Sequence, residues 1–543
     1  MKKEKKIIKK VTALTCAVAM AFSLIGCGNN KDTQVDNTIE DTKNLVIMIP
    51  DNGYGTEYVS ALGEAFEKKH DGVTVKIEVI DSNSSKMGES LRNPENNDVD
   101  LYFNVNPASL AEQLKHAWDG KQALRDLTYL YDSQIPGEDI TLGEKVNASY
   151  KRNLLVEGRT TEDTSDDVYY GLPALTGLMG LYYNETVIDN ALGKGNWSVP
   201  NTTDELIELC KQLKAKGCYF LMPGGMDGFS LSLLPTWWAQ YEGYENYLKF
   251  YEGIGYDTSK DREVENSQYI FSQPGRKAAL DFAYDLVGYE NGYALPNSVE
   301  INVGVLHEYQ SRFFISKNNY AFYPCGSWLP NEVKSNSGLN YDSSVKMMKL
   351  PIISSIIEST DSYSGSSDKR LPNITSDAIL SQVIAYVDGV GELPAGITEQ
   401  EVELIRQTRS LTVGGTSGVI SPAYSNAKKL ADEFLLFMAS DEGLQIVKEN
   451  TYGSFMAYNC EYTGLDEIES SLYEVSQNAI YVADFQYSPL FLRGGIRGLE
   501  GAFGNTLDAA LCMPKGHTGT EIFDAIVKTY SGATWQSVLS RTQ

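Results

Sequence analysis

The residue types that most often carry out chemistry in proteins are sparse in this chain. Its histidines are His70, His116, His307 and His517. None of them has a metal-type spacing to another histidine or to a cysteine, so we expect no metal site. There is no phosphate-binding loop and no nucleophile elbow, and the Gly-rich run GGIRGLEGAFG lacks the order G-x-G-x-x-G after a strand. Among 72 Asp and Glu residues a pair of neighbouring carboxylates is uninformative. The sequence therefore predicts no cofactor, and a glycosidase-type carboxylate pair stays open.

Polar and aromatic side chains follow two short apolar segments near the start of the chain. The candidates are Asp51, Asn52 and Tyr54 after NLVIMI (44–49), and Asn104 and Asn106 at the end of VDLYFNV (99–105). Open α/β sheets bind ligands outside the carboxyl ends of their strands, so these residues are candidate ligand contacts. Asn and Asp are also common in turns, and a purely structural role in a turn or at a helix entry stays open.

A parallel sheet with helical crossovers would position these residues. The segments 44–49, 73–80 and 99–105 are predicted strands, the first because it is a continuous apolar run and the second because its hydrophobicity alternates. A helix with one apolar side is predicted over 56–69, and Pro107 begins another. Strands separated by helices predict parallel pairing and right-handed crossovers.

The same alternation of strands and helices continues along the chain. Thr202 and Glu205 predict a capping box at one helix start, and a strand runs into a Gly turn that presents Trp328. The further predicted elements are strands at 171–184 and 318–328, helices at 202–217 and 425–443, and loops at 358–370 and 389–398. A chain of this length is too large for one core, so we expect two or more domains.

The first 26 residues read as a secretory signal. Six lysines and one glutamate precede an apolar run, Val11 to Ile25, that is too short to span a bilayer comfortably. A helical membrane anchor is the alternative. Without these residues the formal charge of the chain is −31 instead of −26. So acidic a protein repels phosphate backbones, and we expect no nucleic-acid partner.

The end of this run resembles the lipobox of bacterial lipoproteins. Leu24, Ile25 and Gly26 precede Cys27, and a hydrophilic tether follows up to residue 43. The resemblance implies cleavage before Cys27 and acylation of the new N-terminal cysteine, with palmitate among the acyl chains. Such chains would hold the protein at the outer face of the cell membrane of a Gram-positive-type bacterium.

The remaining cysteines do not suggest a disulfide framework. Five are left once the signal and the acylated cysteine are set aside, which is an odd number. Cys210 and Cys218 are eight residues apart at a predicted helix. Eight residues of helix rise about 12 Å, beyond the ~7 Å Cα separation that a disulfide bridges. We expect both thiols to be unpaired.

The order and spacing of several segments resemble the extracellular solute-binding proteins of family 1, the group that contains maltose-binding protein. The most specific segments are YGLPALTGLMGLYYNETVI, the helix after PNTTDELIEL, NNYAFYPCGSW, VKMMKLP and GGTSGVISPAYSNAKKLADEFLLFMASDEG. The likeness covers most of residues 44–535. It implies an α/β, two-lobe, type II periplasmic-binding-protein-like fold. Each lobe would be a mainly parallel sheet flanked by helices, and a hinge would join the lobes.

The resemblance also implies where the chain crosses between lobes. Lobe 1 would comprise residues 44–165 and 352–449, and lobe 2 would comprise residues 176–349 and 450–543. GLPALT (171–176) and KLPII (349–353) would be hinge strands.

Further ligand contacts come from the resemblance alone. Asp227 and Phe229 fall where the family often sets an acid and an aromatic ring against sugar, and Trp328 matches its glycine-turn tryptophan. Adjacent residues diverge by about 100° on a helix, so at most one of Trp237 and Trp238 would face the cleft, and Trp238 is our candidate. The last two candidates, near a family ligand position of lobe 2, are Arg493 and Arg497.

Alternatives to these contacts stay open. Trp328 could be a lobe-core aromatic, and the two arginines could form surface ion pairs. Many sugar binders carry a charged residue where this chain has Thr176 and Gly177. The resemblance therefore implies no specific disaccharide.

The implied function is that of a lipid-anchored, monomeric extracellular protein. It would capture a carbohydrate such as an oligosaccharide and deliver it to the permease subunits of an ABC importer. Sugars stack C–H faces on aromatic rings, and their hydroxyls need donors and acceptors, which the candidate residues supply. Two alternatives remain open: a glycan-cleaving extracellular enzyme, and a two-lobe sensor that presents solute to a histidine kinase.

Overall fold

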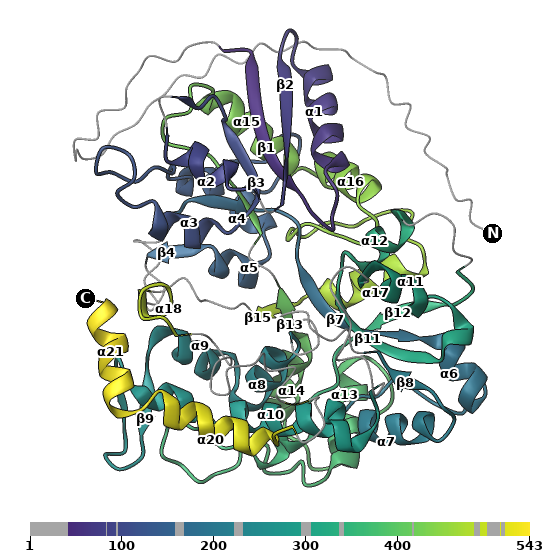
Figure 1. Ribbon diagram of the computed structural model, residues 1–543. Helices are drawn as coiled ribbons and strands as arrows, with labels where there is room; N and C mark the ends of the chain where they lie inside the picture. Colours follow the sequence, from purple (N-terminus) through teal and green to yellow (C-terminus); the bar gives the residue numbers. More distant parts are fainter. Residues whose placement is uncertain are drawn as a thin grey trace, which may run out of the picture. The chain divides into compact units, whose positions relative to one another are not determined.

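Two mixed β-sheets, each covered by helices, make up the described part of the chain in this computed structural model (Figure 1). The described residues are 42–82, 84–93, 96–157, 168–221, 232–294, 306–335, 341–414, 417–482, 489–496, 511 and 516–542. Residues Glu40–Gln543 form one compact unit. The predicted signal, most of the tether, and Cys27 lie outside the described residues.

Sheet 1 has the strand order β2-β1-β3-β14-β6. Its strands are β1 (Asn44–Asp51), β2 (Thr74–Asp81), β3 (Leu101–Val105), β6 (Gly171–Pro173) and β14 (Gly418–Ile420). β1 pairs in parallel with β2 and β3, as the helical crossovers predict, whereas β14 runs antiparallel to both β3 and β6. Four of these strands therefore run in the same direction, as predicted for a mainly parallel sheet, and β14 alone runs against them.

Sheet 2 has the strand order β15-β13-β7-β11-β8, with β12 also paired to β7. Its strands are β7 (Leu178–Asn184), β8 (Tyr219–Phe220), β11 (Tyr320–Gly326), β12 (Val345–Met348), β13 (Leu411–Gly414) and β15 (Ile480–Val482). Every residue of β7 is buried because its alternate side chains enter two different cores. Leu181 and Tyr183 belong to one core and Tyr182 to the other.

Helices cover both sheets. Beside sheet 1 they are α1 (Glu57–Lys69), α2 (Lys86–Leu91), α3 (Pro107–Gln113), α4 (Leu142–Lys145), α15 (Lys428–Met438) and α16 (Asp441–Asn450). α5 (Ala148–Asn153) lies against β15 of sheet 2. Beside sheet 2 they are α6 (Glu185–Leu192), α7 (Thr203–Lys214), α8 (Leu234–Glu242), α9 (Tyr244–Glu252), α10 (Pro274–Val287), α11 (Leu306–Phe313), α12 (Leu329–Ser335), α13 (Asp377–Val387), α14 (Glu399–Ser410), α17 (Glu467–Ser476), α18 (Pro489–Leu492), α20 (Gly519–Thr529) and α21 (Gly532–Thr542). Two small hairpins pair β4 (Leu155–Glu157) with β5 (Val168–Tyr169), and β9 (Gly255–Asp257) with β10 (Arg262–Val264).

The predicted start of α7 is largely confirmed. The Thr202 side chain accepts a hydrogen bond from the backbone of Glu205, as a helix N-cap does. The Glu205 carboxylate, however, accepts from the backbone N–H of Asn201 at 2.7 Å instead of completing the capping box with Thr202. Cys210 lies on the buried side of this helix, and both it and Cys218 are free thiols, as predicted.

Within the described ranges, three segments cross from one sheet and its helices to the other: β6 to β7, β13 to β14, and α16 to α17. These crossing segments are hydrogen-bonded to one another. Thr176 N–H donates to the Phe455 carbonyl at 2.9 Å, and Ala174 N–H donates to the Ser417 carbonyl at 3.1 Å. GLPALT is therefore a crossing, as predicted. We call sheet 1 with its helices lobe 1, and sheet 2 with its helices lobe 2.

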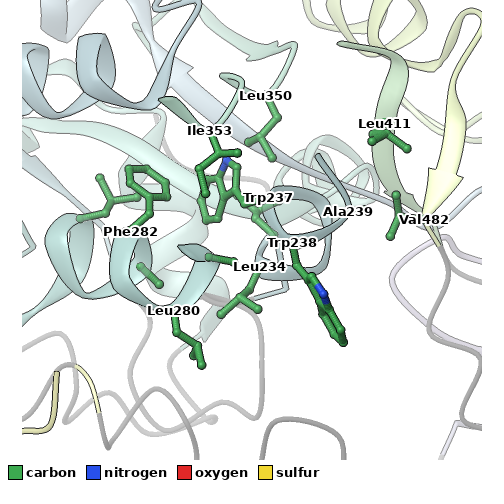
Figure 2. Packing of buried hydrophobic residues seen from close by; sticks show 14 of the residues in the cluster. Leu234, Trp237, Trp238, Ala239, Leu280, Phe282, Leu350, Ile353, Leu411 and Val482 are labelled. Atoms are coloured by element: carbon green, nitrogen blue, oxygen red, sulfur yellow. The ribbon is translucent and has the colours of Figure 1, made fainter. Parts of the chain in front are cut away.

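KLPII is not a crossing, and the return to lobe 1 comes later than predicted. Ile352 N–H donates to the Asn201 carbonyl at 2.8 Å, and Ile353 N–H donates to Gln240 Oε1 at 2.9 Å, both within lobe 2. Figure 2 shows Ile353 and Leu350 beside Trp237 of α8, in the core of lobe 2. The chain returns to lobe 1 only at β14, so the predicted boundary at residue 352 is wrong.

Candidate functional site

The turn after β11 places the Trp328 ring against the loop that follows β1. Gly326 ends β11, and a Cβ at this position would lie 2.1 Å from Cζ3 of Trp328. The missing side chain therefore leaves the space in which the ring folds back over the strand end. The half-buried Trp328 ring packs edge-on against Tyr54, with centroids 5.5 Å apart and planes at 80°. The predicted strand and the turn that presents Trp328 are observed, although Gly326 ends the strand and the turn itself falls at Ser327 and Trp328. Two candidate residues from different lobes come together.

Further contacts join the same two loops. The Asn331 side chain donates from Nδ2 to the Gly53 carbonyl at 3.0 Å. A Cβ on Gly53 would lie 2.7 Å from Oε1 of Glu332 and 3.0 Å from Cδ1 of Trp328. The start of α12 thus lies directly against the loop after β1, and a side chain at position 53 would press on Glu332 and Trp328.

Ser327 connects this junction to the first crossing. Its hydroxyl donates to the Thr176 carbonyl at 3.1 Å, and the Thr176 hydroxyl donates to the Phe455 carbonyl at 2.9 Å. Burial raises the pKa of the Tyr54 phenol far above its usual range, although a hydrogen bond with Ser327 opposes the shift. Tyr54 is therefore a neutral hydroxyl at any physiological pH.

Asp51 and Asn52 shape the loop and line a cavity. Asn52 Oδ1 accepts from Tyr54 N–H at 3.2 Å, which is the turn role that the sequence left open. Asp51 is exposed. Both residues line an open cavity of about 1020 Å³, whose other walls include Asn331 and Glu332. Neither Tyr54 nor Trp328 lines this cavity.

Asn104 presents an amide at the carboxyl end of β3. Its φ of 55° lies in the left-handed region, which asparagine tolerates better than most residues. Its Oδ1 accepts from the Tyr58 hydroxyl at 3.1 Å and from the Ser417 hydroxyl at 3.4 Å. Its Nδ2 is buried and has no hydrogen-bond partner in the described part of the chain. Such an unpaired buried donor costs about 1–3 kcal/mol, which a hydrogen-bond acceptor on a solute would offset.

Asn106 and Arg493 have structural partners. Asn106 caps α3 by accepting from Ser109 N–H at 2.9 Å, the turn role left open by the sequence. Arg493 Nη2 lies 2.7 Å from Oε1 of Glu112 on α3, and half of the arginine side chain is exposed. This is the surface ion pair that the sequence left as an alternative. It joins lobe 2 to lobe 1.

Trp238 is buried among the described residues of lobe 2, so its prediction as a ligand contact is wrong. It is 1% exposed, and its rings pack edge-on against Tyr247 and Phe250 with centroids 4.9 Å away in each case. Its Nε1–H donates to Gln273 Oε1 at 2.7 Å. Figure 2 shows Trp237 and Trp238 pointing to different sides of α8. Both sides are buried, because other elements of lobe 2 surround this helix.

Three candidates, Asp227, Phe229 and Arg497, lie outside the described residues. The structure adds Tyr58, Ser327 and Asn331, which sequence reasoning missed. Asn331 follows Trp328 by three residues, a helical spacing that could have suggested a shared face. Tyr58 lies in the first turn of α1, close to the candidates after β1. Ser417 had no local signal, since its contact with Asn104 spans 313 residues.

No group of three or more His, Cys, Asp or Glu side chains in the described ranges is arranged to hold a metal ion. No helix among the described segments is long and apolar enough to cross a membrane.

Comparisons with known proteins place this geometry in a family. A profile of bacterial extracellular solute-binding proteins matches residues 61–455, which include Asn104 and Trp328. No match was found among curated protein sequences. Similar solved structures include the bacterial solute receptor AcbH, with TM-score 0.56, 12% identity, and coverage of 90% of this chain and 98% of that one.

Two further solved structures share the fold, with similar TM-scores and sequence identities. Apo RafE from Streptococcus pneumoniae has TM-score 0.54 and 15% identity, over 90% of this chain and 98% of its own. A chitin oligosaccharide binding protein has TM-score 0.56 and 15% identity, over 91% of this chain and all of its own. At these identities the likeness supports the two-lobe fold. With the family profile spanning most of its length, the chain belongs to the bacterial extracellular solute-binding proteins.

Proposed function

We propose that this protein is a lipid-anchored receptor that captures a neutral carbohydrate and delivers it to an ABC importer. The single observation that carries the proposal is the pairing of Trp328 with Tyr54 between the lobes. A sugar requires aromatic surface for its C–H faces and nearby donors and acceptors for its hydroxyls. Asn104 supplies an unpaired amide donor at the end of β3.

The charges at the junction disfavour an anionic solute, because Asp51 and Glu332 lie there and the other described candidate contacts are neutral or paired. Tyr54, Asn104, Ser327 and Thr176 are all uncharged, and Arg493 is already paired with Glu112. The similar structures support the same class, since AcbH is described as preferring β-D-galactopyranose and another neighbour as binding chitin oligosaccharides. Asp227, Phe229 and Arg497 stay candidate contacts in this proposal.

Delivery to a permease and a lipid anchor complete the proposal. The family supports an extracellular solute receptor, and a similar structure comes from a probable secreted solute-binding lipoprotein of Streptomyces coelicolor. The sequence before Cys27 supports acylation at this residue. Replacing Cys27 by serine should release the protein from the membrane fraction into the medium. Retention of the variant in the membrane would instead indicate an uncleaved signal helix.

The binding proposal is tested with the chain from residue 28 onward. Isothermal titration with a panel of neutral mono- and oligosaccharides should find at least one saturable ligand. Trp328→Ala should abolish that binding. Trp197→Ala is the matched control, because Trp197 is also a half-buried tryptophan of lobe 2 but bonds Asp189, away from the junction.

The outcomes separate the alternatives. Equal loss in both variants would indicate a folding defect, which the melting temperature of each variant would show. Saturable binding of a peptide or polyamine but of no sugar would refute the carbohydrate class and keep the receptor. Release of new reducing ends from a polysaccharide would indicate an enzyme instead.

A further inference from the structure

A second cavity, of about 710 Å³, lies beside the third crossing. Its walls come from the crossing residues 455–462, from lobe 1 between Glu138 and Asn147, and from lobe 2 between Tyr473 and Tyr481. We call it the crossing cavity. None of the candidate solute contacts lines it, so it is a separate feature of the molecule.

Aromatic rings form one wall of the crossing cavity. Phe455, Tyr462 and Tyr473 pack together with ring centroids 4.9–5.7 Å apart. Tyr462 and Tyr473 are only half-buried, so part of their surface faces outward. Rings with an apolar body and a polar tip suit ligands that are themselves amphipathic.

Uncommitted amides form another part of the wall. The side chains of Asn459, Gln477 and Asn478 are exposed and make no hydrogen bond to any other described residue. Each amide offers both donors and an acceptor. Groups of this kind match hydroxyls, which also donate and accept.

The charges of the cavity exclude anions. Lys145 is 3% exposed, and its Nζ is held between Glu138 at 2.5 Å and Asp441 at 2.6 Å. It therefore has no free charge to offer. Glu461 adds a third carboxylate to the wall. A phosphate or carboxylate ligand would be repelled.

We infer that the crossing cavity binds a neutral, hydroxyl-rich molecule of mono- or disaccharide size. The cavity volume lies in the usual range of small-molecule sites, about 300–1000 Å³. An organic ammonium ion would use the carboxylates but leave the amide N–H groups without acceptors, so the neutral class fits the wall better. The inference is independent of the proposed function, because it rests on the chemistry of this cavity alone.

A blocking substitution tests the inference on the chain from residue 28 onward. Gln477→Trp places a large ring at the wall, whereas Ser470→Trp places the same ring at an exposed position of α17 outside the cavity. Glucose, galactose and N-acetylglucosamine serve as probes in isothermal titration. Gln477→Trp should weaken one binding event by about tenfold or more, and Ser470→Trp should leave it unchanged. A double variant, Asn459→Ala with Gln477→Ala, should weaken the same event without adding bulk.

Trp328→Ala distinguishes this site from the solute site. The inference predicts that one binding event survives in Trp328→Ala and is lost in Gln477→Trp. If all sugar binding is lost in Trp328→Ala and none in Gln477→Trp, the crossing cavity is empty and only the solute site exists. Choline and spermidine are the cationic probes. If one of them binds the parent and loses binding in Gln477→Trp, while no sugar does so, the cavity binds a cation and the neutral class is wrong. If no sugar binds anywhere, both proposals fail.

Discussion

Gly326→Ala tests the geometry on which the proposed site depends. The new methyl group would lie 2.1, 2.2 and 2.3 Å from Cζ3, Cη2 and Cε3 of Trp328. Contact distances between carbon atoms are about 3.5–4.0 Å, so the ring must move by about 1.4 Å or more. The glycine has an ordinary extended backbone in β11, so the methyl group itself adds no backbone strain. The substitution should therefore act only by displacing the Trp328 ring.

The magnitude follows from two terms. Overpacking the strand end costs about 1–3 kcal/mol in total. Of this total, about 0.5–1.5 kcal/mol comes from the lost edge-on contact between Trp328 and Tyr54. We expect the free energy of unfolding to fall by about 1–3 kcal/mol. Trp328→Ala alone should lower the free energy of unfolding by about 2 kcal/mol. This is roughly half of the 3–5 kcal/mol that replacing a fully buried aromatic side chain by alanine costs, because the Trp328 ring is only half-buried. Once the ring is gone, Gly326→Ala should cost almost nothing more.

Urea unfolding followed by far-ultraviolet circular dichroism measures the four members of this double-mutant cycle. The coupling between positions 326 and 328 should equal the cost of Gly326→Ala, about 1–3 kcal/mol. Affinity for the sugar found in the titrations should fall in Gly326→Ala as it does in Trp328→Ala. The reasoning is refuted if Gly326→Ala is as stable as the parent, or if the two costs simply add.

Three further predictions concern single side chains. Tyr58→Phe removes the hydroxyl that orients Asn104. It should lower the free energy of unfolding by about 0.5–1.5 kcal/mol and weaken sugar binding. Unchanged affinity in the titration would show that Asn104 is not part of the site. Trp238→Ala should cost about 3–5 kcal/mol in chemical unfolding but leave affinity intact where the protein is folded, and a selective loss of affinity would contradict its core position. Burial raises the pKa of Glu242, so the folded state holds its proton more tightly than the unfolded state; stability from this group is present at low pH and is lost as the pH rises through the folded pKa. Glu242→Gln should therefore gain stability relative to the parent as the pH rises above about 4, and a pH-independent difference in urea unfolding would argue against the shift.

Local patterns predicted the elements that carry the site. The strands at β1 and β3 follow from runs of apolar residues, and the rule that ligands bind beyond strand ends pointed to Tyr54 and Asn104. The turn at Trp328 followed from its glycine. Each of these predictions depends on residues that are close in sequence, which is why sequence reasoning reached them.

The wrong predictions concern residues whose positions depend on contacts with segments distant in sequence. KLPII has the apolar character of either a hinge strand or a core segment, and Asn201 and Gln240 settle the choice through hydrogen bonds. Trp238 lies on a helix that is buried on every side, so no apolar stripe shows which ring faces solvent. Its neighbours come from α9 and α10, which the pattern of α8 does not reveal.

The position of β14 constrains how the chain is synthesised. This strand lies between β3 and β6 in sheet 1, yet it comes from residues 418–420. As the nascent chain leaves the ribosome, β3 and β6 emerge hundreds of residues before the strand that joins them. Two unpaired strand edges are thus exposed until residues 418–420 have been made, and such edges invite pairing with other chains. Export before folding, or a chaperone that holds the polypeptide, would protect these edges until the last partner arrives.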